Sequence, residues 1–115
     1  MDEKDKLQQQ MAEIGNRYLR RTLGELPRLH ELIGKLRAPA QPVDVSVIEE
    51  IELMAHKIHG SGAMFGFETL SARAGDVELQ AASRASDAQS LQRLADGIAS
   101  LDTEVRAAAR SRGVE

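Results

Sequence analysis

Apolar residues recur at helical spacing along most of this chain. Near the N-terminus they are separated by steps of four, three and four residues, at Leu7, Met11, Ile14 and Tyr18. These steps match one face of an α-helix and predict a first helix from about Asp5 to Leu23.

A glycine and a proline interrupt this pattern. Gly24 lowers helix propensity and Pro27 has no backbone N–H to donate, so we expect the chain to kink or restart there. A second helical piece to about Arg37 then carries apolar residues at helical spacing: Leu29, Leu32, Ile33 and Leu36. Prolines at positions 39 and 42 predict a loop over residues 38–44.

Three further helices follow this loop. Asp44 or Ser46 is suited to cap the third, and Gly60, Gly62 and Gly66 loosen its end. Its apolar face contains Val47, Ile51, Met54, Ile58 and Phe65. The fourth is expected to start near Phe67, with core positions Leu70, Ala74, Val77 and Ala81. The last is long and starts at Ser86-Asp87, with apolar positions Leu91, Leu94, Ile98, Leu101, Val105 and Ala108.

Together these segments predict an all-α fold, an antiparallel four-helix bundle with an additional N-terminal helical segment. The 115 residues fit a single domain over 1–115. Hydrophobic residues make up 42% of the chain but aromatic residues only 3%, so the core has to be built from aliphatic side chains.

Charge and composition exclude several classes of function. The net charge is −3 with acidic and basic residues intermixed, which argues against nucleic acid as a partner. The chain has no cysteine, so it forms no disulfide or thiolate metal site. No apolar run is long enough for a membrane span and no leader pattern is visible, so we expect a cytoplasmic protein without a membrane partner.

On a helical wheel of the third helix, His56 points away from the apolar face. Leu53, His59 and Gly60 lie beside it on this outer side. Gly60, one turn further on, leaves the imidazole uncovered, although it also fits the start of the helix's unravelling toward Gly66.

Residues 56–66 read HKIHGSGAMFG, and this stretch resembles the signature of histidine phosphotransfer domains. The segment from Phe65 to Leu70 is similar to the variant found in chemotaxis-type histidine kinases. The resemblance implies a four-helix bundle in which His56 is phosphorylated, Gly60 leaves room for a receiver domain and Glu78 accepts a hydrogen bond from the ring. It also implies response-regulator receivers and a sensor histidine kinase as partners, with Mg²⁺ on the receiver.

These implied roles agree with elementary chemistry. A neutral imidazole has one nitrogen lone pair with which to attack phosphorus, while a carboxylate on the other N–H fixes the tautomer and stabilises the developing charge. Glu78 lies on the flank of its helix from which it reaches the neighbouring one. The chain has no Walker-type phosphate loop, so we expect no ATP-dependent kinase activity and no cofactor of its own.

The chain departs from the family at His59, where lysine is common. Either His59 donates a neutral hydrogen bond to the phosphoryl group, or Lys57 or an arginine from elsewhere assists. Two other functions stay open: a degenerate adaptor or inhibitor that binds a kinase or receiver without phosphotransfer, and a metal site formed by Glu52, His56 and His59. His30 has no partner visible in the sequence and is interpreted as a surface residue.

Overall fold

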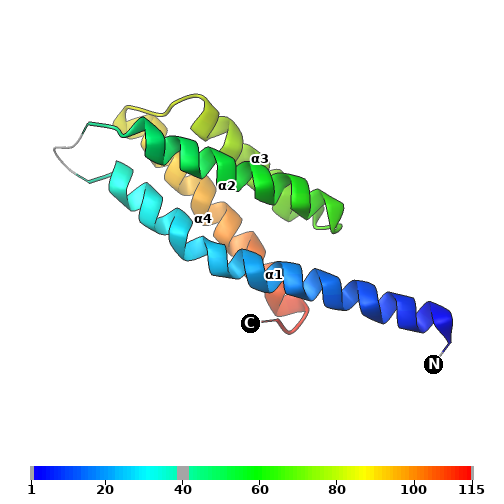
Figure 1. Ribbon diagram of the computed structural model, residues 1–115. Helices are drawn as coiled ribbons and strands as arrows, with labels where there is room; N and C mark the ends of the chain where they lie inside the picture. The colour runs from blue at the N-terminus through cyan, green and yellow to red at the C-terminus, as the bar shows by residue number, and fades with distance from the viewer. Residues whose placement is uncertain (1, 39–41, 115) are drawn as a thin grey trace.

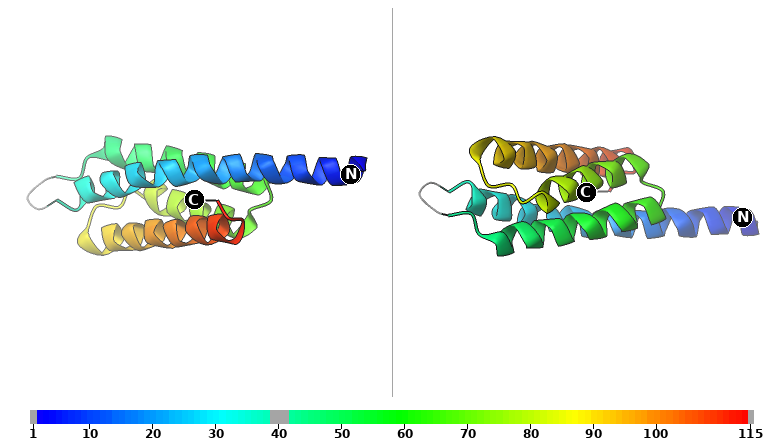
Figure 2. Two further views of the ribbon diagram at one scale, coloured as in Figure 1. Left: turned by 90° about the horizontal axis from the view of Figure 1, so that it is seen from below. Right: turned by 90° about the horizontal axis from the view of Figure 1, so that it is seen from above.

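The computed structural model describes residues 2–38 and 42–114. These residues form four helices and no strand: α1 (Glu3–Leu36), α2 (Val45–Met64), α3 (Glu68–Ala82) and α4 (Ala88–Ser111). Consecutive helices run in opposite directions, and α1 and α4 also contact each other, so the four close into a ring around one core (Figures 1 and 2). The predicted all-α bundle is confirmed. The middle of the predicted proline-containing loop, residues 39–41, lies outside the described residues.

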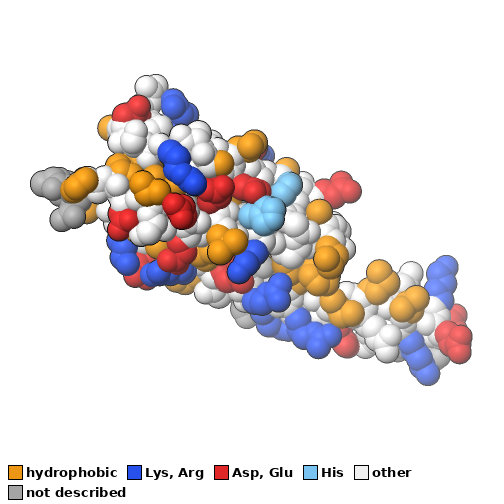
Figure 3. Space-filling view, turned by 45° about the horizontal axis from the view of Figure 1, so that its top comes forward, with side chains coloured by type: hydrophobic (Ala, Val, Ile, Leu, Met, Phe, Trp, Pro, Cys, Tyr) orange, Lys and Arg blue, Asp and Glu red, His pale blue; other side chains and the backbone are white. Residues whose placement is uncertain are grey.

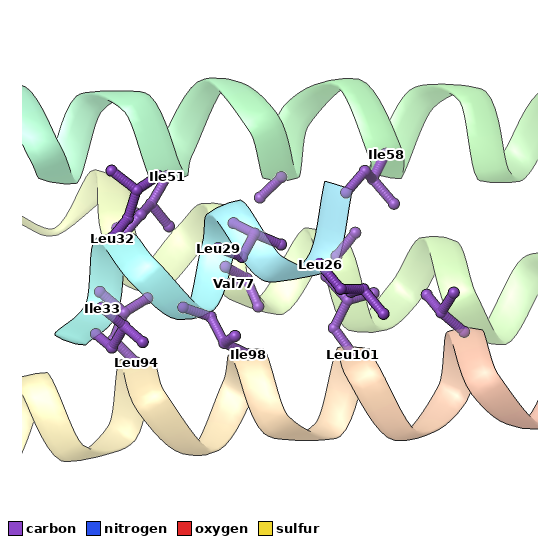
Figure 4. Close-up of a cluster of buried hydrophobic side chains, with 14 of the residues drawn as sticks. Leu26, Leu29, Leu32, Ile33, Ile51, Ile58, Val77, Leu94, Ile98 and Leu101 are labelled. Carbon is purple, nitrogen blue, oxygen red and sulfur yellow. The ribbon is translucent and has the colours of Figure 1, made fainter. Parts of the chain in front are cut away.

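The core is aliphatic, as the composition predicts. Leucine, isoleucine and valine side chains from all four helices meet along the bundle axis (Figure 4). The three aromatic rings gather at one end of the bundle, where Tyr18 lies 4.9 Å from Phe65 and 5.7 Å from Phe67 between ring centroids. Burial of these apolar side chains is the main force that holds the helices together.

The prediction of a helix restart near Gly24 and Pro27 was wrong, because α1 is a single helix of 34 residues with Pro27 in its interior. A proline inside a helix costs about 3 kcal/mol. Leu26 and Leu29 on either side are fully buried, and each such side chain stabilises the fold by roughly 1.5–3 kcal/mol. Tertiary burial therefore outweighs the local cost, and the additional N-terminal segment is continuous with the first bundle helix.

The N-terminal part of α1 extends beyond the other helices (Figure 1). Burial along α1 begins only at Gly15, so the predicted apolar face of the first helix is uncovered at Leu7, Met11 and Ile14. Among the described helices none is long and apolar enough to cross a membrane.

Local sequence signals determine the helix ends. The Asp44 side chain caps α2, and Asp87 forms a capping box with Ser90 at the start of α4. Gly66 has a φ of +83° just after α2, a conformation that favours glycine. The helix continues through Gly60 and Gly62 and ends at Met64.

The buried face of α2 differs slightly from the predicted one. Its buried residues are Ile48, Ile51, Ala55, Ile58 and Gly62. Val47, Met54 and Phe65, which were predicted for this face, are only partly buried at its edges. Glycine occupies position 62 of this face because α3 approaches closely there, with Ser71 Cα 3.3 Å from where a Cβ would lie.

Candidate functional site

His56 lies near the middle of α2 and projects into solvent. Its side chain is 66% exposed, whereas its neighbours Ala55 and Ile58 on the opposite side of the helix are buried. Figure 3 shows histidine side-chain atoms at the surface, next to acidic and hydrophobic side chains. The structure therefore presents this imidazole to other molecules.

Glu78 of α3 orients the ring. Its Oε2 lies 2.7 Å from Nδ1 of His56, and its side chain is 26% exposed. Because an ionised carboxylate only accepts hydrogen bonds, Nδ1 carries the proton and Nε2 of the neutral ring carries the free lone pair. The arrangement gives His56 one tautomer with its nucleophilic nitrogen directed away from Glu78.

The close approach of α2 and α3 brings these two side chains together. A Cβ at Gly62 would lie 3.2 Å from Leu70 Cδ2 and 3.3 Å from Ser71 Cα, so only glycine fits this contact without a shift. On α3, Val77 turns into the core and Glu78 follows it on the flank toward α2. Gly62, less than two turns beyond His56 on the same helix, thus permits the close helix spacing on which the bond between the ring and Glu78 depends.

His59 lies against α3, one turn from His56. Its Nδ1 is 2.8 Å from the Ser71 carbonyl oxygen, to which it donates, and the Ser71 hydroxyl donates to the His59 carbonyl at 2.6 Å. A Cβ at Gly75 would lie 3.0 Å from His59 Nδ1, so the absence of a side chain there leaves space for the ring. Ser71 and Gly75 were not predicted from the sequence, although both share the α2-facing flank of α3 with Glu78.

The bond to Ser71 limits what His59 offers a bound anion. With Nδ1–H donated to the carbonyl, Nε2 of the neutral ring is an acceptor, and it donates only when the ring is protonated. The neutral hydrogen bond that the sequence left open would require the other tautomer and the loss of this contact.

Gly60 is exposed and remains helical. A Cβ placed there would meet no other described atom within 4 Å, in contrast with Gly62. Packing within the described residues therefore does not require glycine at position 60.

The geometry gives the metal alternative no support. The Glu52 carboxylate is 2.6 Å from Arg84, while the other two proposed ligands bond to Glu78 and Ser71. Among the described residues, no group of three or more histidine or acidic side chains is arranged to hold a metal ion.

Two exposed leucines lie on the helices that carry His56 and Glu78. Leu53 on α2 is 53% exposed and Leu79 on α3 is 72% exposed. The sequence identified Leu53 but not Leu79, which follows Glu78 directly. Exposed apolar side chains beside an exposed reactive group are typical of a surface that contacts another protein.

His30 is exposed, as the sequence predicted, and it has a partner that the sequence did not reveal. Its Nε2 lies 2.6 Å from Asp102 of α4, which also binds Arg106 at 2.6 Å. Burial raises the pKa of the Asp102 carboxyl, but hydrogen bonds from His30 and Arg106 outweigh it and hold the pKa below its usual value. The bond between His30 and Asp102 links α1 to α4, whereas the bond between His56 and Glu78 links α2 to α3.

Comparisons with known proteins identify the family of this chain. The family model described as the Hpt domain matches residues 17–104, which is most of the chain and includes all four predicted site residues. No match was found among curated proteins or among solved structures. With an exposed, carboxylate-bound histidine on a four-helix bundle and a family match of this extent, the chain belongs to the Hpt domain family, the histidine phosphotransfer domains of two-component signalling systems.

Proposed function

We propose that this protein is a phosphorelay carrier that accepts a phosphoryl group on His56 from the aspartyl phosphate of one receiver domain and donates it to the aspartate of another. The observation that supports this most directly is the exposed ring whose Nδ1–H is bound by Glu78. A sensor histidine kinase is the proposed origin of the phosphoryl group, and Mg²⁺ acts on the receiver.

The transfer step follows from this tautomer. The Nε2 lone pair of His56 forms a bond to phosphorus as the bond between phosphorus and the receiver's carboxylate oxygen breaks, and the carboxylate leaves with the electron pair. The ring then carries phosphorus on Nε2, a proton on Nδ1 and a positive charge, which Glu78 stabilises through its existing hydrogen bond. Attack by a second receiver's carboxylate reverses these changes and returns the lone pair to Nε2.

Gly60 and His59 complete the proposed site. The space over Gly60 admits the receiver's aspartate to the ring. His59 assists by donating from Nε2 to the phosphoryl oxygens in its protonated form, since Ser71 holds its other nitrogen. Lys57 lies about 100° around the helix from His56 and contributes less directly.

The test is incubation with a phosphorylated receiver in Mg²⁺, followed by measurement of acid-labile phosphate on this protein. We expect His56→Gln to accept none and Glu78→Gln to accept it at least tenfold more slowly. The matched control is His30→Gln, which removes the other exposed histidine bonded to a carboxylate and should leave transfer unchanged. Phosphate retained on His56→Gln at the wild-type level would refute the proposal.

The same assay separates the carrier from the degenerate adaptor. An adaptor would bind the receiver with normal affinity and yet acquire no acid-labile phosphate on the wild-type chain. For His59, replacement by lysine should preserve or raise the rate, whereas replacement by glutamine should lower it. Equal rates in both variants would exclude a role for charge at this position.

A further inference from the structure

The overhang of α1, residues 3–11, presents an apolar stripe to solvent. Leu7 is 57% exposed and Met11 63% exposed, and Ile14 continues the stripe at 41% where the overhang joins the bundle. These side chains lie within about 60° of one another on the helix. The overhang also precedes the residues matched by the Hpt family model, which begin at residue 17, so phosphotransfer chemistry does not account for it.

The stripe runs into a hollow at the end of the bundle. This hollow has a volume of about 270 Å³ and is lined by Ile14, Arg17, Tyr18, Arg21 and Phe65. Its apolar lining thus lies beside two basic side chains. Figure 3 shows hydrophobic side chains along the projecting arm and a cluster of basic ones where it meets the bundle.

The opposite side of the junction is already occupied. Arg112 from the end of α4 packs over the Phe67 ring and approaches Ala12 and Asn16, which lie well away from the stripe on the helical wheel. The stripe therefore remains open while the rest of the junction is packed.

We propose that two copies of this chain associate through their overhangs in an antiparallel pair, with Leu7 of each copy entering the hollow of the other. Such a pair is symmetric about a two-fold axis perpendicular to the helices. When Leu7 is aligned with Ile14 of the second copy, Met11 of each copy lies next to this axis. A single patch then serves both copies and the assembly closes as a dimer.

Charge supports a second copy as the occupant. Glu3 lies one turn before Leu7, on the same flank of α1 as Arg21, with Arg17 further round on that side. In an antiparallel helix pair, the same flank of each helix lies next to that flank of the other. Aligning Leu7 with Ile14 then places Glu3 opposite Tyr18 of the second copy, between that copy's Arg17 and Arg21. The overhang therefore supplies the leucine and the carboxylate that complement the hollow.

The size of the surface determines the expected strength. From Glu3 to Ile14 the helix is about 18 Å long, so the contact is smaller than a standard stable interface. We expect a dimer that dissociates on dilution, with a Kd in the range of about 10⁻⁵ to 10⁻⁴ M.

Sedimentation velocity of the full chain over a concentration series tests the association. Met11→Glu should remain monomeric at concentrations where the wild type is dimeric, a loss of at least tenfold in affinity. Gln9→Glu adds the same charge on the opposite side of the overhang and should dimerise normally. A wild type that stays monomeric at 1 mM, or a dimer unaffected by Met11→Glu, would overturn the proposal.

Disulfide trapping tests the alignment, because the chain has no native cysteine. Met11→Cys should crosslink to itself near the axis, while Leu7→Cys should crosslink efficiently only when mixed with Ile14→Cys. Self-crosslinking of Leu7→Cys as fast as Met11→Cys would indicate a parallel pair and contradict the model. Phosphate acceptance by Met11→Glu is measured alongside, so failure of the dimer and failure of the His56 assignment are read separately.

Discussion

Two histidines of this protein hydrogen-bond to carboxylates, and their surroundings differ. His56 uses Nδ1 to bind Glu78, which leaves Nε2 free on an exposed side chain, with the exposed Leu53 one turn before it on α2. His30 uses Nε2 to bind Asp102, and Arg106 shares that carboxylate, so the aspartate's charge is partly satisfied before the ring bonds to it. A ring bonded to a carboxylate thus occurs twice among the described residues. We propose His56 as the phosphoryl acceptor because its side chain is more exposed, 66% against 47% for His30, and because Arg106 does not compete for its carboxylate.

A substitution at Gly60 tests whether this glycine is there for receiver access to His56 or for helix packing. Because a Cβ there meets no described neighbour, Gly60→Ala should raise the free energy of unfolding by up to about 1 kcal/mol through helix propensity. If the glycine leaves room for the receiver, the same variant should accept phosphate several-fold more slowly. Denaturant unfolding and the receiver transfer assay measure the two effects.

The control for this comparison is Gly24→Ala on α1, another helical glycine with open space around its Cβ position. It should gain similar stability and transfer phosphate at the wild-type rate. A Gly60→Ala variant that transfers as fast as Gly24→Ala would mean that the glycine has no role in access.

At the scale of elements, α1 contains a conflict between local and tertiary preferences. Pro27 is exposed in the helix interior, where it cannot donate the backbone hydrogen bond of an ordinary residue. The helix persists because buried leucines on both sides of it hold the segment in the core. Helix continuity here is a property of the packed bundle.

It follows that Pro27→Ala should raise the free energy of unfolding by about 1–3 kcal/mol, since it restores a helix donor without changing the core. Chemical denaturation measures this change, and circular dichroism at 222 nm checks that helix content is retained. A decrease in stability would instead mean that the bundle depends on the local geometry imposed by the proline.

At the scale of the whole molecule, three aspartates make the stability of the fold depend on pH. Hydrogen bonds from Ser46 lower the pKa of Asp44, and hydrogen bonds from Ser90 lower the pKa of Asp87. At Asp102, burial raises the pKa, but the bonds from His30 and Arg106 outweigh burial and give a net lowering. All three groups therefore bind protons less tightly in the folded state than in the unfolded one.

The sign of the pH dependence follows from these shifts. A carboxyl with a lowered folded pKa contributes its full stability above the unfolded pKa, near 3.9 for aspartate, and loses it as pH falls through the folded pKa. We expect the melting temperature to fall below about pH 5. Asp102→Asn should be less stable than wild type at pH 7, with a difference that shrinks toward pH 2.5; a constant difference would show that the ionised form does not matter.

Much of this protein was predictable from local sequence. Apolar spacing predicted the buried faces of α3 and α4, except that Ala109 is buried at the end of α4 and the predicted Ala108 only partly so. Asp44 and Asp87 marked helix starts, because caps and helical periodicity depend on residues a few positions apart. The string at residues 56–66 identified the family, and the wheel of α2 predicted that His56 points outward, because that orientation depends on a single helix.

The tertiary structure decided what depends on contacts between helices. It kept α1 continuous through Pro27, moved the buried face of α2 toward Ala55 and Gly62, and bound His59 to Ser71. It also left the overhang's apolar stripe uncovered, since periodicity predicts a face but not whether another helix reaches it. Sequence thus determined which way each helix turns its residues, and packing determined which of those residues meet.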